Sequence, residues 1–262
     1  MGKRIKEKSN IYKSFINIAN CIIIQLINYH MQLFFIAHIT DNIAYLTEEE
    51  ATHCVRVLRH KVGDELTFMD GKGGFYTGKL IQADPKKCAL SILTSKQAYG
   101  LRSQYLHVAI APTKNMDRLE WFVEKAVEIG VEEISLIATN RTERSVVKIE
   151  RLEKIILAAA KQSVKAYLPV INPLVKLKDF LKQDFEGGKF IAHLADDHRK
   201  SFREEIAKAD KNLILIGPEG DFTLPEIESA FASHFVPVTL GASRLRTETA
   251  GMYACAVASV VK

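Results

Sequence analysis

Cysteine is scarce in this chain of 262 residues, and its four copies lie far apart in the sequence. They form no CxxC pair and stand in apolar surroundings, where a thiol behaves as a small hydrophobic group. The positions are Cys21, Cys54, Cys88 and Cys255. This usage argues against a zinc site and indicates a protein of the reducing cytoplasm.

Long hydrophobic runs are also missing, and no stretch approaches membrane-spanning length. The stretch NCIIIQLINYH follows a basic start, but Gln25 and Asn28 interrupt it and no small-residue cleavage site follows. We therefore expect neither a membrane segment nor a signal peptide. Residues 1–30 are interpreted as an N-terminal extension, either disordered or the product of a wrongly assigned start codon.

A basic field over the whole molecule is absent as well. The formal net charge is +5, but residues 1–30 carry five basic residues against Glu7 alone and so contribute +4, which leaves about +1 for the remainder. Any contact with nucleic-acid phosphates must therefore come from a local patch. The hydrophobic fraction of 47% suits one large domain or two modest ones.

Residues 31–98 contain short apolar runs separated by turns, which predicts a small β domain. The sequence GKGG between Met69 and Phe75 indicates a hairpin, because consecutive glycines supply the positive φ angles that tight turns need. Basic and aromatic residues gather in this part of the sequence: Arg56, Arg59, His60, Lys61, Lys72, Phe75 and Tyr76. Together they suit single-stranded RNA, although a solvated helix end explains the basic residues nearly as well.

Residues 105–262 alternate apolar strands with helices, a pattern typical of an α/β domain with a mostly parallel sheet. The first helix is expected to end at Gly130 and to bury the residues at helical spacing, which are Leu119, Phe122, Val123, Ala126 and Val127. Another helix is expected within residues 199–209. The last helix is expected from Thr247, with a buried face of Ala250, Tyr253, Ala254 and Val257.

Two polar motifs follow strands of this domain, at the edge where ligands bind in parallel α/β sheets. In LIGPEGDFT, Gly217 and Gly220 let the backbone approach a ligand, Pro218 stiffens the loop and Glu219 offers an acceptor. Thr223 is expected to cap the next helix. Taken alone, the motif is equally consistent with an ordinary turn between a strand and a helix.

The second motif is LGASRLRTETA. Its simplest interpretation is that Thr247 caps the last helix, Glu248 stabilises the positive end of that helix, and the arginines lie in solvent. Two arginines, Arg244 and Arg246, on a loop that also turns at Gly241 favour a functional site instead.

Other chemistries are poorly supported. No phosphate-binding loop with its lysine is present, and the histidines lack the spacing of metal ligands, so each is interpreted as a surface or core residue. Ser163 and Ser243 have no histidine and aspartate partners at motif level, so a hydrolase triad is not indicated.

Several longer stretches then resemble one family. HCVRVLRHKVGDELTFMDGKGGFY, KNMDRLEWFVEKAVEIGV, TERS, KQSVKAYLP, LIGPEGDFTLPEI and VTLGASRLRTETA occur in the order and at roughly the spacing of the RsmE family. These ribosomal RNA small subunit methyltransferases of the SPOUT superfamily methylate N3 of a uridine in 16S rRNA. The resemblance covers about Met31 to Val261.

The resemblance implies a SPOUT-type α/β domain with a C-terminal trefoil knot, preceded by a small PUA-like β-barrel. It also implies a homodimer that acts on 16S rRNA of the small ribosomal subunit, uses S-adenosyl-L-methionine and needs no metal. The implied cofactor residues are Leu194, Ile216, Gly217, Pro218, Glu219, Gly220, Leu240, Gly241, Leu245, Arg246 and Thr247. The implied RNA contacts are Arg56, Arg59, Lys61, Lys72, Lys114, Gln162 and Lys165.

The chain departs from the family pattern at a few positions. Relatives commonly carry an arginine near the start of the barrel, where this chain reads MQLFFIAHI, and EQSGR where it reads KQSVK from Lys161 to Lys165. Lysine keeps the positive charge but loses the planar fork that grips phosphate or base. Relatives also often have a second glycine in place of Asp221 and an isoleucine in place of Leu245.

The implied reaction assigns roles to the polar motifs. N3 of uracil is a poor nucleophile while protonated and lies on the pairing edge, so the base must be turned out of its stack. An arginine would stabilise the charge that develops on O2 and O4, with Arg246 as the first candidate and Arg244 as the second. Glu248 or Glu219 would accept the proton.

Three alternatives stay open at this point. In the first, the chain is a SPOUT methyltransferase that acts on another RNA, such as tRNA. In the second, it is a non-catalytic RNA-binding factor of ribosome assembly, which would not bind S-adenosylmethionine. A nucleotide-dependent enzyme built on GPEG would instead bind ATP or GTP.

Overall fold

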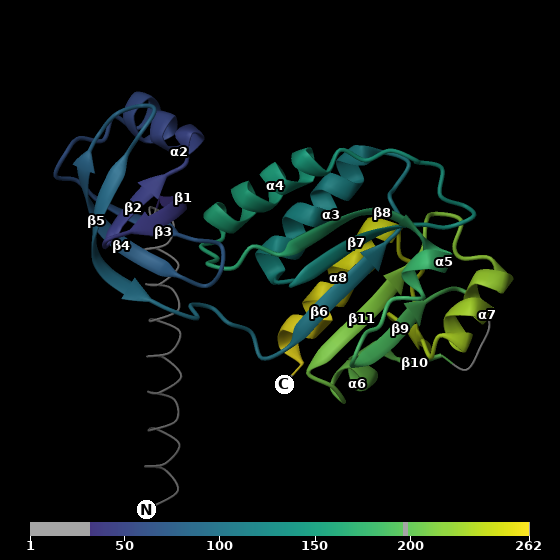
Figure 1. Cartoon of the computed structure of the whole chain (residues 1–262). Coiled ribbons are helices and arrows are strands. Elements are labelled where there is room, and N and C mark those ends of the chain that lie inside the picture. Colours follow the sequence, from purple (N-terminus) through teal and green to yellow (C-terminus); the bar gives the residue numbers. More distant parts are fainter. Residues whose placement is uncertain (1–31, 196–198, 262) are drawn as a thin grey trace, which may run out of the picture. The chain divides into compact units, whose positions relative to one another are not determined.

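The chain forms two compact units in a computed structural model that describes residues 32–195 and 199–261 (Figure 1). The first unit comprises residues 32–70 and 75–96, and the second comprises residues 71–74 and 97–261. The interpretation of residues 1–30 as an extension lies outside the described residues. Within the described ranges, no helix has the length and apolar character needed to cross a membrane.

The first unit is a closed five-stranded barrel with the order β1-β2-β5-β4-β3, which confirms the predicted small β domain. Its strands are β1 (Leu33–Thr40), β2 (Ile43–Leu46), β3 (Glu65–Met69), β4 (Phe75–Gln82) and β5 (Ala89–Lys96). Neighbours pair antiparallel except β1 and β3, whose parallel pairing closes the barrel. Between β2 and β3 lie a short helix, α2 (Glu48–Thr52), and one π-helical turn, η1 (His53–Val57).

The barrel closes around aromatic and aliphatic side chains that alternate along its strands. Phe34, Phe68, Leu80 and Leu90 are fully buried inside it. The GKGG stretch forms the predicted hairpin, since Met69 pairs with Phe75 across it. Both Gly71 and Gly73 have positive φ, as this turn requires.

The second unit contains a seven-stranded sheet of the order β10-β12-β9-β11-β6-β7-β8, in which every neighbouring pair is parallel. The strands are β6 (Tyr105–Ile110), β7 (Glu133–Ala138), β8 (Val170–Lys176), β9 (Gly188–Ala192), β10 (Lys200–Ser201), β11 (Lys211–Ile216) and β12 (Val236–Thr239). The prediction of a parallel α/β sheet is confirmed.

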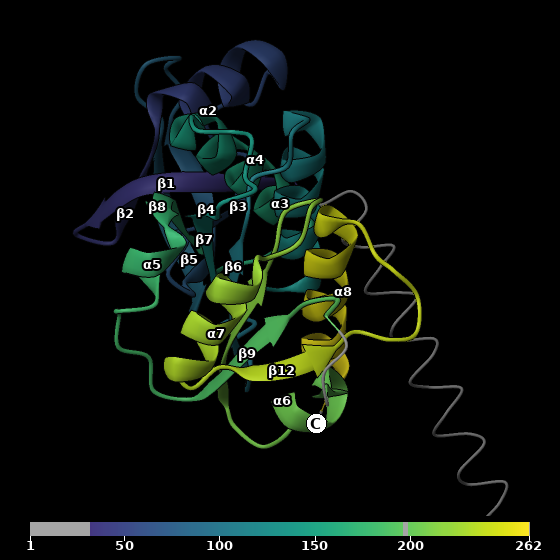
Figure 2. The same ribbon diagram turned by 90° about the vertical axis from the view of Figure 1, so that its right-hand side faces the viewer.

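Helices cover both faces of this sheet (Figure 2). They are α3 (Met116–Ile129), α4 (Ile149–Gln162), α5 (Leu177–Phe180), α6 (Phe202–Ile206), α7 (Leu224–Ala232) and α8 (Thr247–Val260). The long helices α3, α4 and α8 pack together with α6 on one face, and α5 and α7 cover the other. α7 begins as predicted after Thr223, whose backbone N–H donates to the Glu226 carboxylate in a capping box.

The predicted buried face and the predicted end of α3 are both confirmed. All five predicted core residues are buried, and the helix ends before Gly130, which has a φ of 126°. Its other end is capped by Asn115, whose side-chain oxygen accepts from the N–H of Asp117 at 3.0 Å.

The prediction of the buried face of α8 was partly wrong. The helix begins at Thr247 as predicted, but Tyr253 is 41% exposed and Ala250 is only half-buried. Gly251 lies against α3 and β6 instead, and a Cβ atom there would stand 2.6 Å from the Phe122 ring. The helix packs through its smallest residues because they allow the closest approach to its neighbours.

Two elements differ from the sequence expectation. The strand β8 was missed because Pro173 interrupts its pattern, and the structure places it at the edge of the sheet, where proline is tolerated. The helix expected within residues 199–209 is only five residues long, preceded by the short strand β10.

Candidate functional site

The loops that follow β9, β11 and β12 meet at the carboxyl edge of the sheet and enclose a cavity of about 400 Å³. This volume is typical of small-molecule sites, which span roughly 300–1,000 Å³. The predicted cofactor residues line it, with the exception of Gly220, and so does Arg244. Residues separated by up to about 50 positions in the sequence therefore converge, because parallel neighbours deliver their loops to the same edge.

The β11 loop is tied directly to the start of α8. The hydroxyl of Thr247 is buried and donates to the carbonyl of Gly217 at 2.9 Å. A Cβ atom at Gly217 would lie 3.0 Å from the Phe222 ring, so glycine lets the loop turn tightly above the sheet. The two polar motifs thus form one rigid wall of the cavity.

Asp221 connects the β11 loop with the β9 loop. Its φ is 63°, in the left-handed region that favours glycine, which accounts for the glycine that relatives often carry here. Its carboxylate accepts from the N–H of Leu194 and from the N–H of Phe222, both at 2.8 Å. Aspartate therefore adopts this uncommon backbone conformation, and its carboxylate adds two hydrogen bonds that fix the shape of the cavity.

Glu219 is engaged in a similar way. Its carboxylate accepts from the N–H of Lys114 at 3.1 Å, in the loop that follows β6. Arg144 donates to the carbonyl of Lys114 at 2.7 Å, and Arg141 donates to the carbonyl of Gly220. These contacts hold three loops together, so the geometry favours a positioning role for Glu219 over proton transfer.

Glu248 has a different environment in the first turn of α8. It is 7% exposed, and its Oε1 atom lies 3.9 Å from Nε of Arg118. Its Oε2 atom is buried and has no hydrogen-bond partner among the described residues. Of the two predicted proton acceptors, Glu248 is the one whose unpartnered oxygen is buried, whereas Glu219 is exposed. Arg246 and Arg244 are both exposed at the rim of the cavity.

Several residues of the cavity were not predicted from the sequence. Arg118, His193 and Arg199 line it, and Arg199 donates to the carbonyl of His193 at 2.9 Å. Arg118 lies in the stretch DRLEW, and only the packing of α3 against α8 brings it to the site. For His193 and Arg199, the only sign in the sequence of a place in the cavity was their position after β9, because no motif marks them.

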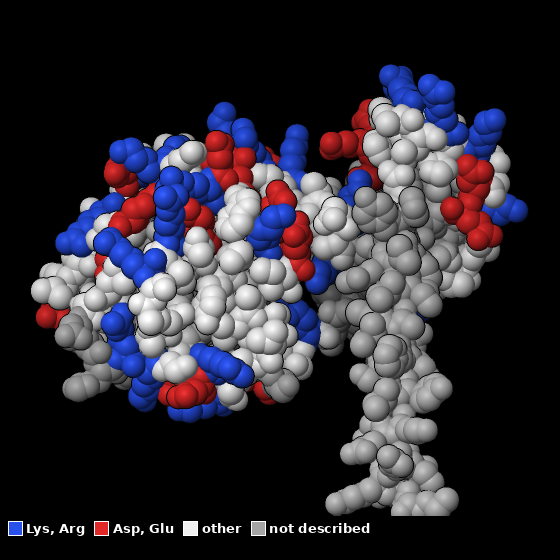
Figure 3. All heavy atoms as spheres, turned by 180° about the vertical axis from the view of Figure 1, so that it is seen from behind, with Lys and Arg blue, Asp and Glu red and all other residues white. Residues whose placement is uncertain are grey.

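The predicted RNA patch of the barrel is only partly present. Arg56, Arg59 and Lys61 are exposed after α2, and Figure 3 shows Lys and Arg side chains at that end of the barrel. The aromatic part of the prediction was wrong, since Phe75 and Tyr76 are 9% and 6% exposed. The Tyr76 ring packs in the barrel core against Phe68. Phe75 is the preceding residue of β4 and points to the other face of the strand, but it is buried as well, so both rings are closed to RNA bases.

The remaining RNA candidates do not form one surface. Lys72 is exposed, and Lys114 is exposed and forms an ion pair with Glu143 at 2.9 Å, which raises the pKa of Lys114. Gln162 and Lys165 lie near the end of α4, at the opposite edge of the sheet from the Lys114 loop. Lys165 is half-buried, and desolvation lowers its pKa, with a smaller contribution from Arg102.

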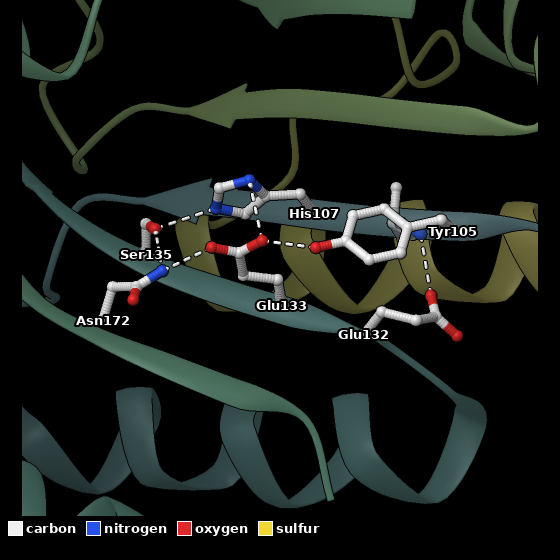
Figure 4. A network of polar contacts seen from close by, with 7 residues as sticks. Tyr105, His107, Glu132, Glu133, Ser135 and Asn172 are labelled. Carbon is white, nitrogen blue, oxygen red and sulfur yellow. Dashed lines mark hydrogen bonds and ion pairs between the residues drawn. The ribbon is translucent and has the colours of Figure 1, made fainter. Parts of the chain in front are cut away.

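A second polar cluster lies at the amino edge of the sheet (Figure 4). Nε2 of His107 and Oγ of Ser135 are 2.8 Å apart, and Nδ1 of His107 lies 3.6 Å from the Glu133 carboxylate. Asn172 donates to Glu133 at 2.6 Å, and the Tyr105 hydroxyl donates to the same carboxylate. The order resembles a serine hydrolase triad, but Ser135 is 2% exposed within β7. His107 is thus a satisfied core histidine, as predicted.

The comparisons with known proteins agree with this division into units. The RNA methyltransferase domain family matches residues 102–259, and the RNA methyltransferase PUA domain family matches residues 46–93. The Ribosomal RNA small subunit methyltransferase E of Rickettsia conorii is 30% identical over 223 residues, which span 80% of this chain and 87% of the relative. This chain belongs to the ribosomal RNA small subunit methyltransferase E family.

Solved structures of the family share the fold. The crystal structure of a probable rRNA-methyltransferase from Porphyromonas gingivalis has a TM-score of 0.77 and 39% identity, over 86% of this chain and 95% of that one. The family member from Neisseria gonorrhoeae, solved bound to S-adenosyl methionine, has a TM-score of 0.71 and 26% identity, over 87% and 96%. The present chain is thus an RNA methyltransferase with a PUA-like barrel and a SPOUT-type α/β domain.

Proposed function

We propose that this chain methylates N3 of a uridine in 16S rRNA of the small ribosomal subunit, with S-adenosylmethionine as the methyl donor. The observation that carries the proposal is the cavity at the carboxyl edge of the sheet. There, the two family motifs are joined through Thr247 and Gly217 beside a carboxylate and two arginines.

The cavity suits S-adenosylmethionine chemically. Leu240, Leu245 and Val238 offer apolar surface for an adenine ring, while the loop backbone and the carboxylates of Glu219 and Asp221 offer hydrogen-bonding groups. When bound, the cofactor supplies a methyl group on a positively charged sulfur, which keeps the electron pair of the broken bond and becomes a neutral thioether. Among the described residues, no group of three or more His, Cys, Asp and Glu side chains is arranged to hold a metal ion.

The residues around the cavity have different roles in the proposed reaction. Glu248 accepts the N3 proton at its vacant Oε2 atom, which turns N3 into a nucleophile. Arg246 stabilises the negative charge on the uracil oxygens while the proton leaves, and Arg244 is the second candidate. Glu219 and Asp221 hold the loops that align the two reactants.

RNA binding and assembly complete the proposal. Arg56, Arg59 and Lys61 of the barrel bind RNA phosphates without help from aromatic stacking. A second copy of the chain covers α8, where Tyr253 is 41% and Val260 is 74% exposed. From behind, the second unit shows a broad area without charged side chains (Figure 3), which supports this homodimer. The trefoil knot, the boundaries at residues 31–98 and 105–262, and action in the cytoplasm are parts of the same proposal.

The test is direct. Purified protein and S-adenosylmethionine are incubated with small ribosomal subunits from cells that lack the modification, and the digested RNA is searched for N3-methyluridine by mass spectrometry. A gain of that nucleoside is expected. Cofactor binding without a gain would point to another RNA, such as tRNA, and loss of both would leave a non-catalytic RNA-binding protein.

A further inference from the structure

A cavity of about 610 Å³ lies at the amino edge of the sheet, away from the cofactor cavity. Its lining includes the residues directly before three neighbouring strands, which are Gln104 before β6, Glu132 before β7 and Pro169 before β8. β6 has six residues, so the two edges are about 20 Å apart at about 3.3 Å per residue. A ligand in this cavity is therefore separate from the cofactor and from the base that receives the methyl group.

Two cationic side chains line this cavity without enough acceptors. Arg102 donates through Nη1 to the Glu132 carboxylate at 3.1 Å, but its Nη2 atom is buried and has no hydrogen-bond partner among the described residues. Lys165 forms no hydrogen bond or ion pair with any residue that the structure describes. Desolvation lowers the pKa of Lys165, and Arg102 lowers it further, because the two positive charges lie close together.

The charges and donors of the cavity are not balanced. Glu132 is the carboxylate beside both cations, and it already accepts from the N–H of Leu106 at 2.7 Å (Figure 4), so one positive charge is left over. Gln104 is 3% exposed, and its Nε2 atom has no partner in the described part of the chain. Its Oε1 atom accepts from Asn212 at 3.0 Å, which leaves Nε2 as the unmet donor. Buried donors without acceptors are costly, so the fitting ligand brings acceptor atoms and a negative charge.

Close backbone contacts hold two side chains of the cavity in place. A Cβ atom at Gly130 would stand 2.8 Å from Nη1 of Arg102, so the guanidinium packs directly on the end of α3. The ring of Tyr167 packs on Gly73 in the same way. Gly73 belongs to the second unit, and its carbonyl accepts from the N–H of Tyr99 at 3.0 Å. The groups that would contact a ligand are thus held in position by the backbone around them.

The rest of the lining is aromatic and apolar. It includes the half-buried rings of Tyr99, Tyr105 and Tyr167 and the side chains of Val131 and Leu168. Flat aromatic surfaces beside cations suit a nucleotide, because the base stacks on a ring while the phosphate accepts charge-assisted hydrogen bonds. The volume lies within the range of roughly 300–1,000 Å³ that is usual for small-molecule sites.

We propose that this cavity binds one nucleotide, whose phosphate accepts from Lys165 and Arg102 and whose base stacks against the tyrosine rings. The site goes beyond the proposed function, since the methylated uridine is bound at the opposite edge of the sheet. A free nucleotide and a nucleotide within an RNA strand present the same phosphate and base. The shared chemistry therefore defines the site, and the experiment separates the two sources.

Calorimetry on the full-length protein tests the site directly. Protein saturated with S-adenosylhomocysteine, which occupies the cofactor cavity, is titrated with adenosine monophosphate, adenosine or ribose 5-phosphate. We expect adenosine monophosphate to bind, and each fragment to bind at least about tenfold more weakly, because one lacks the phosphate and the other the base. The titration is repeated after a 16S-derived oligoribonucleotide is added. Loss of nucleotide binding would identify RNA as the source, and unchanged binding would identify a free nucleotide.

Variants of Lys165 separate ligand binding from a structural role. Lys165→Met should weaken nucleotide binding about tenfold, since a charge-assisted hydrogen bond is lost. Its thermal unfolding midpoint should not fall, because a desolvated cation without a partner does not stabilise the fold. Lys165→Arg keeps the charge and should stay within about threefold of wild type. Lys154→Met is the matched control, since it removes an exposed lysine of α4 that does not line the cavity.

Two results would overturn the proposal. Adenosine and adenosine monophosphate that bind equally well would show that the cavity does not hold a phosphate. Nucleotide binding and RNA affinity that are both the same in Lys165→Met and wild type would place any bound nucleotide elsewhere. In either case N3-methyluridine would still form on small subunits, so failure of this assignment is distinct from failure of the proposed function.

Discussion

Two glutamates at opposite edges of the same parallel sheet differ in how their carboxylates are satisfied. At the amino edge, Glu133 is surrounded by Tyr105, Asn172 and His107, whose side chains all face it (Figure 4). At the carboxyl edge, Glu248 is more deeply buried, yet one of its oxygens has no partner among the described residues.

The difference separates a structural group from a reactive one. A carboxylate whose acceptors are all engaged holds its neighbours in place and has nothing left for a ligand. A buried carboxylate with a vacant oxygen bears a cost that the fold itself does not offset, which is typical of a functional site. The comparison therefore predicts that the two edges respond to mutation in different measurements.

The largest effect is expected at the carboxyl edge from Arg246→Ala. Loss of a donor that stabilises transition-state charge lowers kcat by about 10²–10³. Arg246 is exposed, so the thermal unfolding midpoint should stay within about 1 °C of wild type. Methyl transfer to small ribosomal subunits and a thermal melt measure both quantities, and Arg244→Ala serves as the control with a smaller loss. Near-normal turnover of the Arg246 variant would remove this residue from the mechanism.

At the amino edge, Glu133→Ala should act on stability instead. The change removes the carboxylate that accepts from the partly buried Tyr105 hydroxyl and Asn172 amide, at a cost of about 1–3 kcal/mol in the free energy of unfolding. Urea denaturation measures this loss. The Kd of S-adenosylmethionine, measured by calorimetry well below the melting temperature, should not change; a large change would show that the edges are coupled.

The pH dependence of stability should also originate at the amino edge. Desolvation lowers the pKa of His107 below its usual 6.5, more strongly than Glu133 raises it. The unfolded chain then binds a proton more readily than the folded chain, so this contribution is fully present above pH 6.5 and is lost as the pH falls through the lowered pKa. Urea titrations between pH 5 and 7.5 should show this slope, and His107→Asn should flatten it. An unchanged slope in the variant would assign the effect to another group.

A smaller effect is expected for Asp221→Gly, which restores the residue that relatives often carry. Glycine suits the positive φ, but the bonds to the N–H groups of Leu194 and Phe222 disappear. We expect the Kd of S-adenosylmethionine to rise about 3- to 10-fold through a looser β9 loop, with kcat little changed. Calorimetry and saturation kinetics test this, and an unchanged Kd would show that the loop is held without the carboxylate.

The smallest effect is expected in the barrel, from Arg59→Ala. Arg59 is exposed, and we expect its removal to weaken RNA binding several-fold and to reduce the salt dependence of the affinity by about one phosphate contact. Filter binding at several salt concentrations measures both, with cofactor binding as the control. RNA affinity equal to wild type would show that this patch of the barrel does not bind RNA.

Cysteine reactivity offers no rival chemistry in the barrel. Cys54 and Cys88 meet in its core, and burial raises the pKa of Cys54 to about 12 and that of Cys88 in the same direction. Both thiols are therefore protonated at neutral pH and unreactive. Their distance in the sequence gave no hint of this contact, whereas their apolar surroundings correctly indicated that they are core residues.

Local patterns in the sequence were enough to predict several features. The spacing from Leu119 to Val127 determined the buried face of α3, and GKGG determined the hairpin between β3 and β4. Alternation of strands and helices predicted the parallel sheet, and the motif positions after β11 and β12 placed them at its carboxyl edge. Each of these depends on neighbours along the chain or on a rule of sheet topology.

Other features were decided only when distant segments met. Tyr253 is exposed because Gly251, and not the larger residues, allows α8 to approach α3, and Tyr76 is buried because the barrel core closes around it. The engagement of Glu219 by Lys114 and the vacant oxygen of Glu248 likewise depend on segments more than a hundred residues apart. The sequence by itself determined which elements form and which motifs face the ligand edge, because those follow from short-range periodicity and strand order. Which polar groups find partners there was decided by tertiary packing, because satisfaction of a buried group depends on atoms that only the folded chain brings within hydrogen-bonding distance.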